Sequence, residues 1–265
     1  MSSGAPPPPG ADTDADGRGE GTPSVRRLGV RYRRQVAPGD VGRRVSIRHL
    51  VDDPARGPVP SDVVGRLAAM DDELLLVVDR AGRLHVLDAT RVVASRVVPA
   101  HPRLPAEPDL GTRTAPLPRQ AARVLLLDGD RVLLVAHAPD ATRRVWTAPG
   151  GGLDAGEDHA VAARRELREE LGVDVEVGPW VWHRRVVFAF RGLWLDQDER
   201  WYLAKAPVVD AARAPLDDPG ALRARWWPLA ELATTEETLA PTALAEHLAD
   251  LLRDGPPAAP RDVGR

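Results

Sequence analysis

The sequence predicts an α+β protein in which a small all-β domain precedes a mixed sheet covered by helices. Three observations indicate this fold. Short alternating runs fill residues 25–98, Asp128-Gly129-Asp130 gives a hairpin signal between two apolar runs, and residues 158–171 have helical periodicity. Gly172 follows that helix at the position where a left-handed C-cap favours glycine.

The small domain is expected at residues 25–98. Alternating runs at 41–48, 63–68, 74–78 and 83–87, with a fifth at 92–99, are typical of a small barrel or sandwich. The segment resembles the SH3-like barrel that precedes the acetyltransferase domain in some bacterial GNAT proteins, and residues 42–48, 61–65 and 92–99 carry the resemblance. Nine arginines against three aspartates in residues 25–56 are interpreted as a solvated face, because aromatic interleaving for base stacking does not accompany the charge.

The composition bounds the rest of the chain. Its 265 residues are 43% hydrophobic, which supports real cores, and the net charge of −3 argues against a nucleic-acid coat protein. Cysteine is absent, which excludes disulfides, thiolate zinc sites and cysteine nucleophiles. Residues 1–24 and 254–265 are expected to be disordered tails, and the Pro-rich residues 99–117 a linker. The sequence has neither a signal pattern nor a membrane span, so the expected location is the cytoplasm.

Positive charge is almost wholly arginine, and Lys205 is the only lysine. Alanine, proline and glycine are also abundant. We therefore interpret the arginines as codon choice in a high-GC genome, ahead of phosphate recognition by the planar guanidinium.

The larger domain is expected at residues 118–253. Strands are expected at residues 123–127, 131–136, 174–177, 181–190, 200–206 and 224–227, with a closing amphipathic helix at 241–253. Residues 196–199 are expected to form a loop before the fifth of these strands. Helices on such a mixed sheet imply an α+β or α/β sandwich.

Three carboxylates are expected on one face of the helix at residues 158–171. Glu166, Glu169 and Glu170 are i, i+3 and i+4 neighbours, whereas Leu167 and Leu171 belong to the stripe that packs on the sheet. Like charges this close repel one another, and a hard divalent cation such as Mg²⁺, which prefers oxygen ligands, resolves the repulsion. A solvated acidic face is the alternative, and the ordered pattern over residues 151–173 favours the metal site.

The turn before this helix supports the same hypothesis. Its glycines allow the backbone to approach a metal or a phosphate, near helix N–H groups that attract anions. Arg165 is expected to point off the carboxylate face and to pair with Glu157 at the junction of loop and helix. That pairing would hold the loop on the helix.

Residues 151–173 match the Nudix box at every defining position, and Pro149-Gly150-Gly151 is the usual lead-in. The one departure is Asp154, where many members have glutamate, which changes the reach of the side chain but not its charge. Residues 225–232 also resemble the late strand and turn of this family, so the resemblance covers residues 118–253. The chain is similar to Nudix hydrolases, whose α/β/α sandwich surrounds a mixed sheet. They hydrolyse a nucleoside diphosphate linked to another moiety and use Mg²⁺ or Mn²⁺.

This resemblance implies the roles of the box residues. The implied metal ligands are Glu166, Glu169, Glu170 and the backbone carbonyl of Gly151 or Gly150. Glu157 and Arg165 would be the structural pair, with Glu157 in reach of a second metal through water.

A carboxylate must also take the proton of the attacking water. The candidates are Glu166 in the box, which we favour, and Asp198 or Glu199. Other side chains are candidates for substrate binding, by stacking on a base or by contact with phosphates. These are Trp146, Arg143, Arg144 and Glu199. His137, His159 and His183 show no ligand spacing and are expected to be ordinary polar residues.

Two alternatives remain at this stage. An isoprenoid-diphosphate isomerase shares the fold but needs a catalytic cysteine, which this chain lacks. A sensor or adaptor that binds a nucleotide metabolite without turnover is the second, although such proteins usually lose box glutamates. The substrate stays open among ADP-ribose, other nucleotide sugars, dinucleoside polyphosphates and oxidised nucleoside triphosphates. Nucleic acid and membrane are not expected partners, and a homodimer is compatible with the sequence.

Overall fold

The computed structural model describes residues 36–53, 56–99, 111–140, 143–154, 156–205, 209–216 and 221–264. The tail expected at residues 1–24 and most of the linker expected at residues 99–117 lie outside these ranges. Within these ranges, no helix is both long enough and apolar enough to cross a membrane.

Five antiparallel strands form the N-terminal sheet, which confirms the all-β class expected for this part. They are β1 (Arg44–Asp53), β2 (Gly57–Met70), β3 (Leu74–Asp79), β4 (Leu84–Asp88) and β5 (Val92–Val97), and 3-10 turns lie at Pro38–Asp40 and Ala89–Arg91. Their order in the sheet is β4-β3-β2-β1-β5. Val45, Ile47, Leu67 and Val77 are fully buried in its core. The resemblance to an SH3-like barrel stays a prediction.

The C-terminal part is built on a mixed sheet, as expected. Its strands are β6 (Leu117–Asp128), β7 (Arg131–Asp140), β8 (Arg143–Thr147), β9 (Trp180–Phe190), β10 (Leu193–Lys205), β11 (Ala221–Pro228), β12 (Leu239–Ala240) and β13 (Arg261–Asp262). The order is β12-β8-β7-β6-β10-β9-β13, with β11 paired to β7. β6 and β7 are antiparallel around the turn at Gly129, whereas β6 and β10 are parallel. A 3-10 turn lies at Ala211–Arg213.

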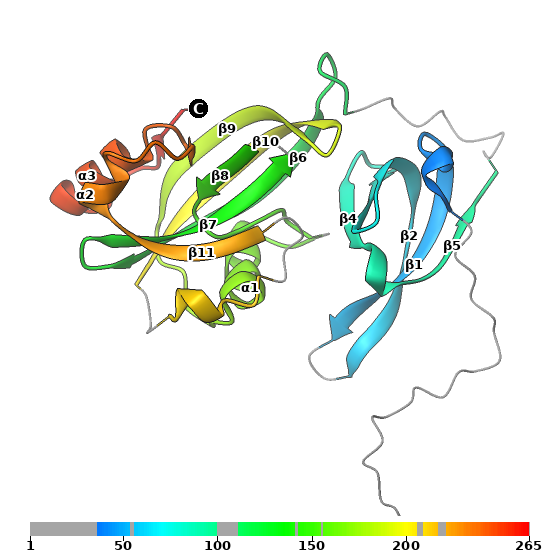
Figure 1. Ribbon diagram of the computed structural model, residues 1–265, viewed down its shortest axis with the longest axis horizontal. Coiled ribbons are helices and arrows are strands. Elements are labelled where there is room, and N and C mark those ends of the chain that lie inside the picture. Colours follow the sequence, from blue (N-terminus) through cyan, green and yellow to red (C-terminus); the bar gives the residue numbers. More distant parts are fainter. Residues whose placement is uncertain are drawn as a thin grey trace, which may run out of the picture. The chain divides into compact units, whose positions relative to one another are not determined.

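Helices cover both faces of this sheet. Figure 1 shows α1 (His159–Leu171) on one side and the pair α2 (Leu229–Leu232) and α3 (Leu244–Asp254) on the other. α1 begins where the Asp158 carboxylate accepts from the N–H groups of Ala160 and Val161, and it ends at Gly172, whose φ is 68°. The result is the α/β/α sandwich that the sequence predicts.

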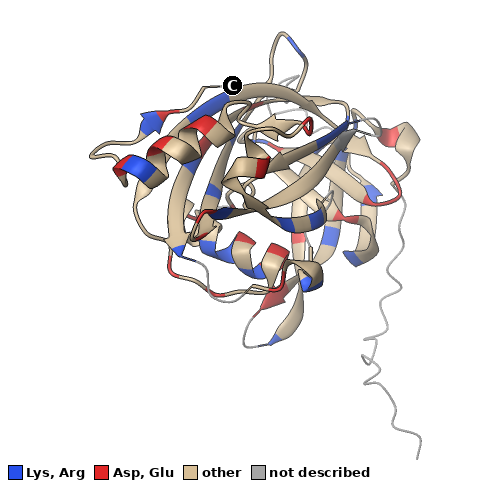
Figure 2. Cartoon of the chain, turned by 60° about the vertical axis from the view of Figure 1, so that its left-hand side comes forward, with Lys and Arg blue, Asp and Glu red and all other residues tan. Residues whose placement is uncertain are grey.

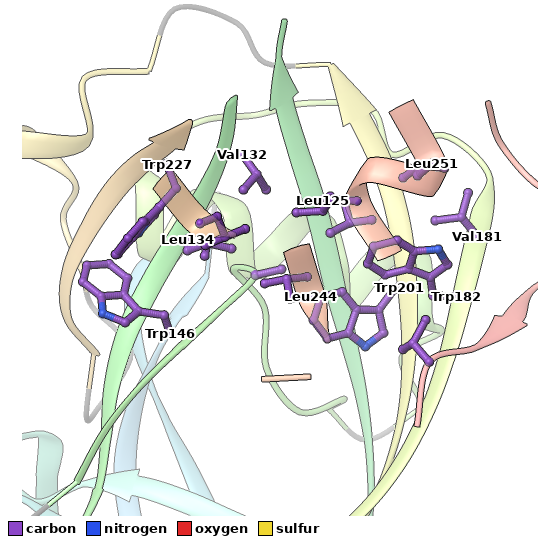
Figure 3. Packing of buried hydrophobic residues seen from close by; sticks show 14 of the residues in the cluster. Leu125, Val132, Leu134, Trp146, Val181, Trp182, Trp201, Trp227, Leu244 and Leu251 are labelled. Carbon is purple, nitrogen blue, oxygen red and sulfur yellow. The ribbon is translucent and has the colours of Figure 1, made fainter. Parts of the chain in front are cut away.

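A separate core lies on each face. Leu167 and Leu171 of α1 pack with Val124 and Val135 of the sheet. On the other face, tryptophans from several strands gather around Leu244 of α3 (Figure 3). The tryptophans form two pairs, Trp146 with Trp227 at 5.1 Å between ring centroids and Trp182 with Trp201 at 5.9 Å. Burial of rings this large contributes strongly to the stability of this face.

Two expectations about strands are wrong. Residues 174–177 are described and form no strand; Val175 and Val177 instead pack as loop residues against the α1 core, which accounts for their apolar alternation. Residues 196–199 are not a loop but lie inside β10. Their polar side chains are satisfied there by neighbours: the Asp196 carboxylate accepts from the Arg185 guanidinium of β9, and Glu199 is buried among donors.

The disorder expected for residues 254–265 is also wrong over the described part, residues 254–264. Arg261–Asp262 forms β13, a parallel neighbour of β9, and the N–H of Val263 donates to the His183 carbonyl at 3.0 Å. Val263 is 4% exposed and belongs to the tryptophan-rich core. The segment is polar and Pro-rich, so one buried valine carries little signal in the sequence.

Candidate active site

The three carboxylates of α1 differ in their exposure. Glu170 is fully buried and Glu166 is 5% exposed, whereas the Glu169 side chain is 46% exposed. Glu166 and Glu169 line a pocket beside the helix. Burial of two ionisable carboxyl groups is costly unless each has partners or a cation nearby. Glu166 and Glu170 are therefore not part of a solvated surface, whereas Glu169 is exposed to solvent.

The glycine turn before α1 lies directly against these carboxylates. The N–H of Gly150 donates to Glu170 Oε2 at 2.8 Å. A Cβ atom on Gly151 would lie 2.4 Å from Glu166 Oε1, so no other residue fits there without displacing that carboxylate. The carbonyl of Gly151 accepts from the N–H of Ala122 on β6 at 2.9 Å, which fixes the turn against the sheet. This geometry explains why the pattern requires glycine at both positions.

Arg165 joins the loop to the carboxylates of the helix. Its guanidinium donates to both oxygens of Glu157 at 3.1 Å and to the Gly152 carbonyl at 2.8 Å. It also donates to Glu166 Oε1 at 2.9 Å and to Glu169 Oε2 at 2.8 Å, so it does not point off the carboxylate face. Burial lowers the pKa of Arg165, but these carboxylates raise it by more, and the group stays protonated.

The box residues offer oxygen atoms to a divalent cation. Within the described ranges, no three acidic or histidine side chains already stand in a ligating arrangement. However, one nitrogen of Arg165 contacts both Glu166 and Glu169, so these two carboxylates already stabilise a positive charge between them. Carboxylate oxygens beside a glycine backbone are the donor set that hard cations such as Mg²⁺ prefer. The residues present fit such an ion.

The pocket beside the box is rich in arginine. On the C-terminal domain Arg119, Arg123, Arg143 and Arg184 line it together with Glu166 and Glu169. A Cβ atom on Gly152 would lie 2.8 Å from the guanidinium of Arg119, so this side chain lies over the box backbone. Elsewhere acidic and basic residues are interspersed along the elements (Figure 2). The pocket thus combines carboxylates for a cation with guanidinium groups for an anion.

Glu199 lies in the middle of β10 and also lines this pocket. Burial raises the pKa of its carboxyl, but Arg123, Arg184 and the Gln197 amide lower it further, so Glu199 stays ionised. Because side chains alternate along a strand, Asp198 points to the opposite face, where its Oδ1 lies 2.9 Å from His183 Nε2. Asp198 is not among the residues that line the pocket.

Two residues expected to bind substrate are placed away from the pocket. Trp146 is fully buried between Trp227 and Arg223, in the core between the sheet and α3, so the base-stacking role is wrong. Arg144 lies outside this pocket, in a shallow depression with Glu236 and Glu237. The sequence could not separate them from Arg143, because only the pleat of β8 decides which side each neighbour faces.

His137 was missed by the sequence analysis, as were Arg119, Arg123 and Arg184. His137 lines the pocket, and its Nε2 lies 3.7 Å from Oε1 of Glu170, which is buried behind the lining. Burial, with Arg123 and Arg119 nearby, lowers the pKa of His137 to about 3, so its imidazole is neutral. These residues come from β6, β7 and β9 and lie outside the box, and no local spacing marks them.

Comparison with known proteins places the C-terminal part in a family. The family model described as NUDIX domain matches residues 117–251. An RNA pyrophosphohydrolase of Roseobacter denitrificans is 30% identical over 126 residues, which cover 43% of this chain and 79% of that protein.

Two solved structures illustrate the matches by shape. A MutT Nudix hydrolase from Burkholderia pseudomallei is 23% identical, with a TM-score of 0.40, and the match covers 49% of this chain and 97% of that protein's chain. An ADP-ribose pyrophosphatase from Streptococcus suis is 18% identical, with a TM-score of 0.39, and the match covers 55% of this chain and 98% of that protein's chain. With the box geometry and the family match together, the chain belongs to the Nudix hydrolase family.

Proposed function

We propose that this protein hydrolyses a diphosphate linkage in a nucleoside diphosphate derivative, with Mg²⁺ or Mn²⁺ bound at the box. One observation carries the proposal most directly. Glu166 and Glu169 face a pocket in which a cation, the Arg165 guanidinium, already contacts both, and arginines line the rest of that pocket. A diphosphate with its bound metal ion also pairs positive with negative charge: the metal ion would lie against the two carboxylates, and the phosphate oxygens against the arginines.

The metal ligands in this proposal are Glu166, Glu169 and Glu170, with the carbonyl of Gly151 beside them. When bound, the cation neutralises diphosphate oxygens and lowers the pKa of a water molecule. The residues of the protein position the metal ligands and bind the substrate. Arg165 holds Glu157 and the Gly152 carbonyl, and so keeps the loop on the helix.

The chain also supplies the charge that the substrate needs. Arg119 and Arg143 line the pocket and would bind phosphate oxygens as planar donors. Glu166 is the proposed general base, because its carboxylate faces the pocket at the metal site. Glu199 is a poor base, since both of its oxygens accept hydrogen bonds from buried donors.

The substrate class is proposed from the pocket and from the relatives. Among the described residues, several guanidinium groups line the pocket together with the aromatic side chains of Phe188 and Phe190, and no tryptophan of the buried core does. We therefore expect the guanidinium groups to recognise phosphate charge, with Phe188 and Phe190 available to a base. Among the open candidates, this favours dinucleoside polyphosphates and nucleoside triphosphates over nucleotide sugars. The related protein named RNA pyrophosphohydrolase adds a 5′-triphosphorylated RNA to the compounds to be tested.

The experiment measures phosphate release at slightly alkaline pH, with Mg²⁺ and then Mn²⁺. The panel holds ADP-ribose, a dinucleoside polyphosphate, a nucleoside triphosphate and its oxidised form, and triphosphorylated RNA. A phosphatase converts the products of the first two, whose phosphates are capped at both ends, and an inorganic pyrophosphatase converts the pyrophosphate released from the triphosphates. Glu170→Gln is the test variant, and Glu246→Gln, at an exposed position of α3, is the matched control. Turnover in wild type and Glu246→Gln, with none in Glu170→Gln, supports the proposal.

Turnover that survives in Glu170→Gln contradicts the metal site. Absence of turnover for every compound, together with a raised melting temperature in the presence of one of them, indicates a binding protein without hydrolysis.

A further inference from the structure

Glu199 is a buried carboxylate with an unusually complete set of donors. Its Oε1 accepts from the Gln197 amide at 2.7 Å and lies 3.4 Å from Arg123 Nε. Its Oε2 accepts from the Trp201 indole at 3.0 Å and from Arg184 at 3.2 Å. A buried carboxylate that lacks such partners destabilises a protein by several kcal/mol, so the arrangement is a specific construction. The box does not contain this residue, and the proposed chemistry gives it no step.

Arg123 extends this construction to the box. Besides Glu199, its guanidinium donates to the carbonyl of Gly150 and, at 3.3 Å, to that of Ala148. The N–H of the same Gly150 donates to Glu170 Oε2 at 2.8 Å. Both backbone polar groups of Gly150 are therefore held, one by Arg123 and one by the carboxylate of Glu170. A displacement of Arg123 moves the donor that orients Glu170.

Arg184 is the second arginine that contacts Glu199, and it links Glu199 to the C-terminal residues. One of its nitrogens reaches Glu199, and its Nε donates to the carbonyl of Gly264 at 3.2 Å. Gly264 is held there because Val263 is buried in the tryptophan-rich core and β13 pairs with β9. The C-terminal residues therefore anchor one of the two arginines that neutralise Glu199.

We propose that Glu199 is a positioning residue of the metal site: it holds Arg123 against the Gly150 carbonyl and thereby fixes the glycine that orients Glu170. The proposal rests on the metal-dependent function proposed above. Glu199 itself touches neither metal nor substrate in this role. The fork of the Arg123 guanidinium is the essential link, because one group must bind a carboxylate and a carbonyl at the same time.

The test measures Mn²⁺ binding directly, from the electron paramagnetic resonance signal of the free ion during titration of the full-length protein. Two variants break the link at different points. Glu199→Gln removes the charge that holds Arg123, and Arg123→Lys keeps a positive charge beside Glu199 but loses the fork. Asp196→Asn and Arg185→Lys are matched controls, because these residues form an arginine–carboxylate pair between β10 and β9, outside the pocket, in which the Arg185 side chain is exposed.

We expect both test variants to bind Mn²⁺ about 10–100-fold more weakly, the usual effect of removing a partner that orients a metal ligand. The controls should match wild type. Circular dichroism and the melting temperature show which variants are folded at the titration temperature. If Glu199→Gln does not fold, Arg123→Lys decides the test, because it buries no unpaired charge.

Wild-type affinity in a folded test variant overturns the proposal, as does an equal loss in the controls. Wild type that binds Mn²⁺ but hydrolyses no compound of the panel contradicts the proposed function alone, since binding still measures the positioning role. Wild type without Mn²⁺ binding overturns both.

Discussion

Gly150→Ala is the substitution that most sharply tests the geometry of the glycine turn. Gly150 has a φ of 133°, which L side chains rarely adopt. A Cβ atom there would lie 2.1 Å from the carbonyl oxygen of Ala122 on β6. The residues on either side of Gly150 are hydrogen-bonded to β6, since the carbonyls of Pro149 and Gly151 accept from the N–H groups of Val124 and Ala122. The turn therefore cannot move aside like a flexible side chain.

The magnitude follows from two costs. A non-glycine residue in such a backbone conformation costs about 1–3 kcal/mol, and a forced clash in a packed region costs about 1–3 kcal/mol more. The free energy of unfolding should fall by about 2–6 kcal/mol in total. For a domain of this size, each kcal/mol corresponds to about 3 °C, so we expect a loss of about 6–18 °C in melting temperature.

Gly156→Ala is the matched control. Gly156 lies in the same loop, with a φ of 81°, and has no atom within 4 Å of the position of a Cβ. It should show the conformational cost alone, about 1–2 kcal/mol, or about 3–6 °C. Thermal unfolding followed by tryptophan fluorescence measures both variants. A Gly150→Ala protein as stable as Gly156→Ala would refute the close approach of the turn to β6.

Arg165, Glu170 and Val263 each give a further test. Arg165→Ala removes donors from Glu157, Glu166, Glu169 and the Gly152 carbonyl. It should lower the free energy of unfolding by about 3–5 kcal/mol and also lower the rate of hydrolysis. The control Arg164→Ala breaks an exposed pair with Asp174 and should cost under about 1 kcal/mol in denaturant unfolding. Glu170→Gln should abolish metal-dependent phosphate release while circular dichroism still shows folded protein, and release at the wild-type rate would remove Glu170 from the metal site. Val263→Asp buries an unpaired charge in the tryptophan-rich core and should lower the melting temperature by about 10 °C or more. The control Val161→Asp lies at an exposed position of α1 and should leave the melting temperature nearly unchanged. Equal effects of the two variants would contradict the packing of the C-terminal residues on this core.

The sequence predicted the parts of the fold that depend on local order. α1 was predicted from its periodicity and from Gly172 at its C-terminus, and both appear in the structure. The β6–β7 hairpin was predicted from Asp128-Gly129-Asp130, because that tripeptide itself makes the turn. The order of the box residues likewise predicted that Glu157 and Arg165 would meet, since they are only eight residues apart.

Contacts across the sheet could not be predicted in this way. Arg123 and Glu199 are 76 residues apart in sequence, and their contact depends on the parallel pairing of β6 with β10. A polar run such as residues 196–199 has the composition of a loop when its partners are unknown. The same limit applies to Val263, whose burial depends on β9 and on the core beneath α3.

The abundance of arginine has two different explanations within this chain. Exposed pairs such as Arg164 with Asp174 contribute little to stability even where they are bidentate, and codon choice stays our interpretation of such residues. Arg165 is different, because it contacts the loop and the helix carboxylates with separate nitrogens, and Arg123 joins a carboxylate to a carbonyl in the same manner. A lysine ammonium is a point charge on a flexible stem and cannot hold two such groups in fixed directions. Codon choice therefore does not explain these positions, where the planar fork builds the site.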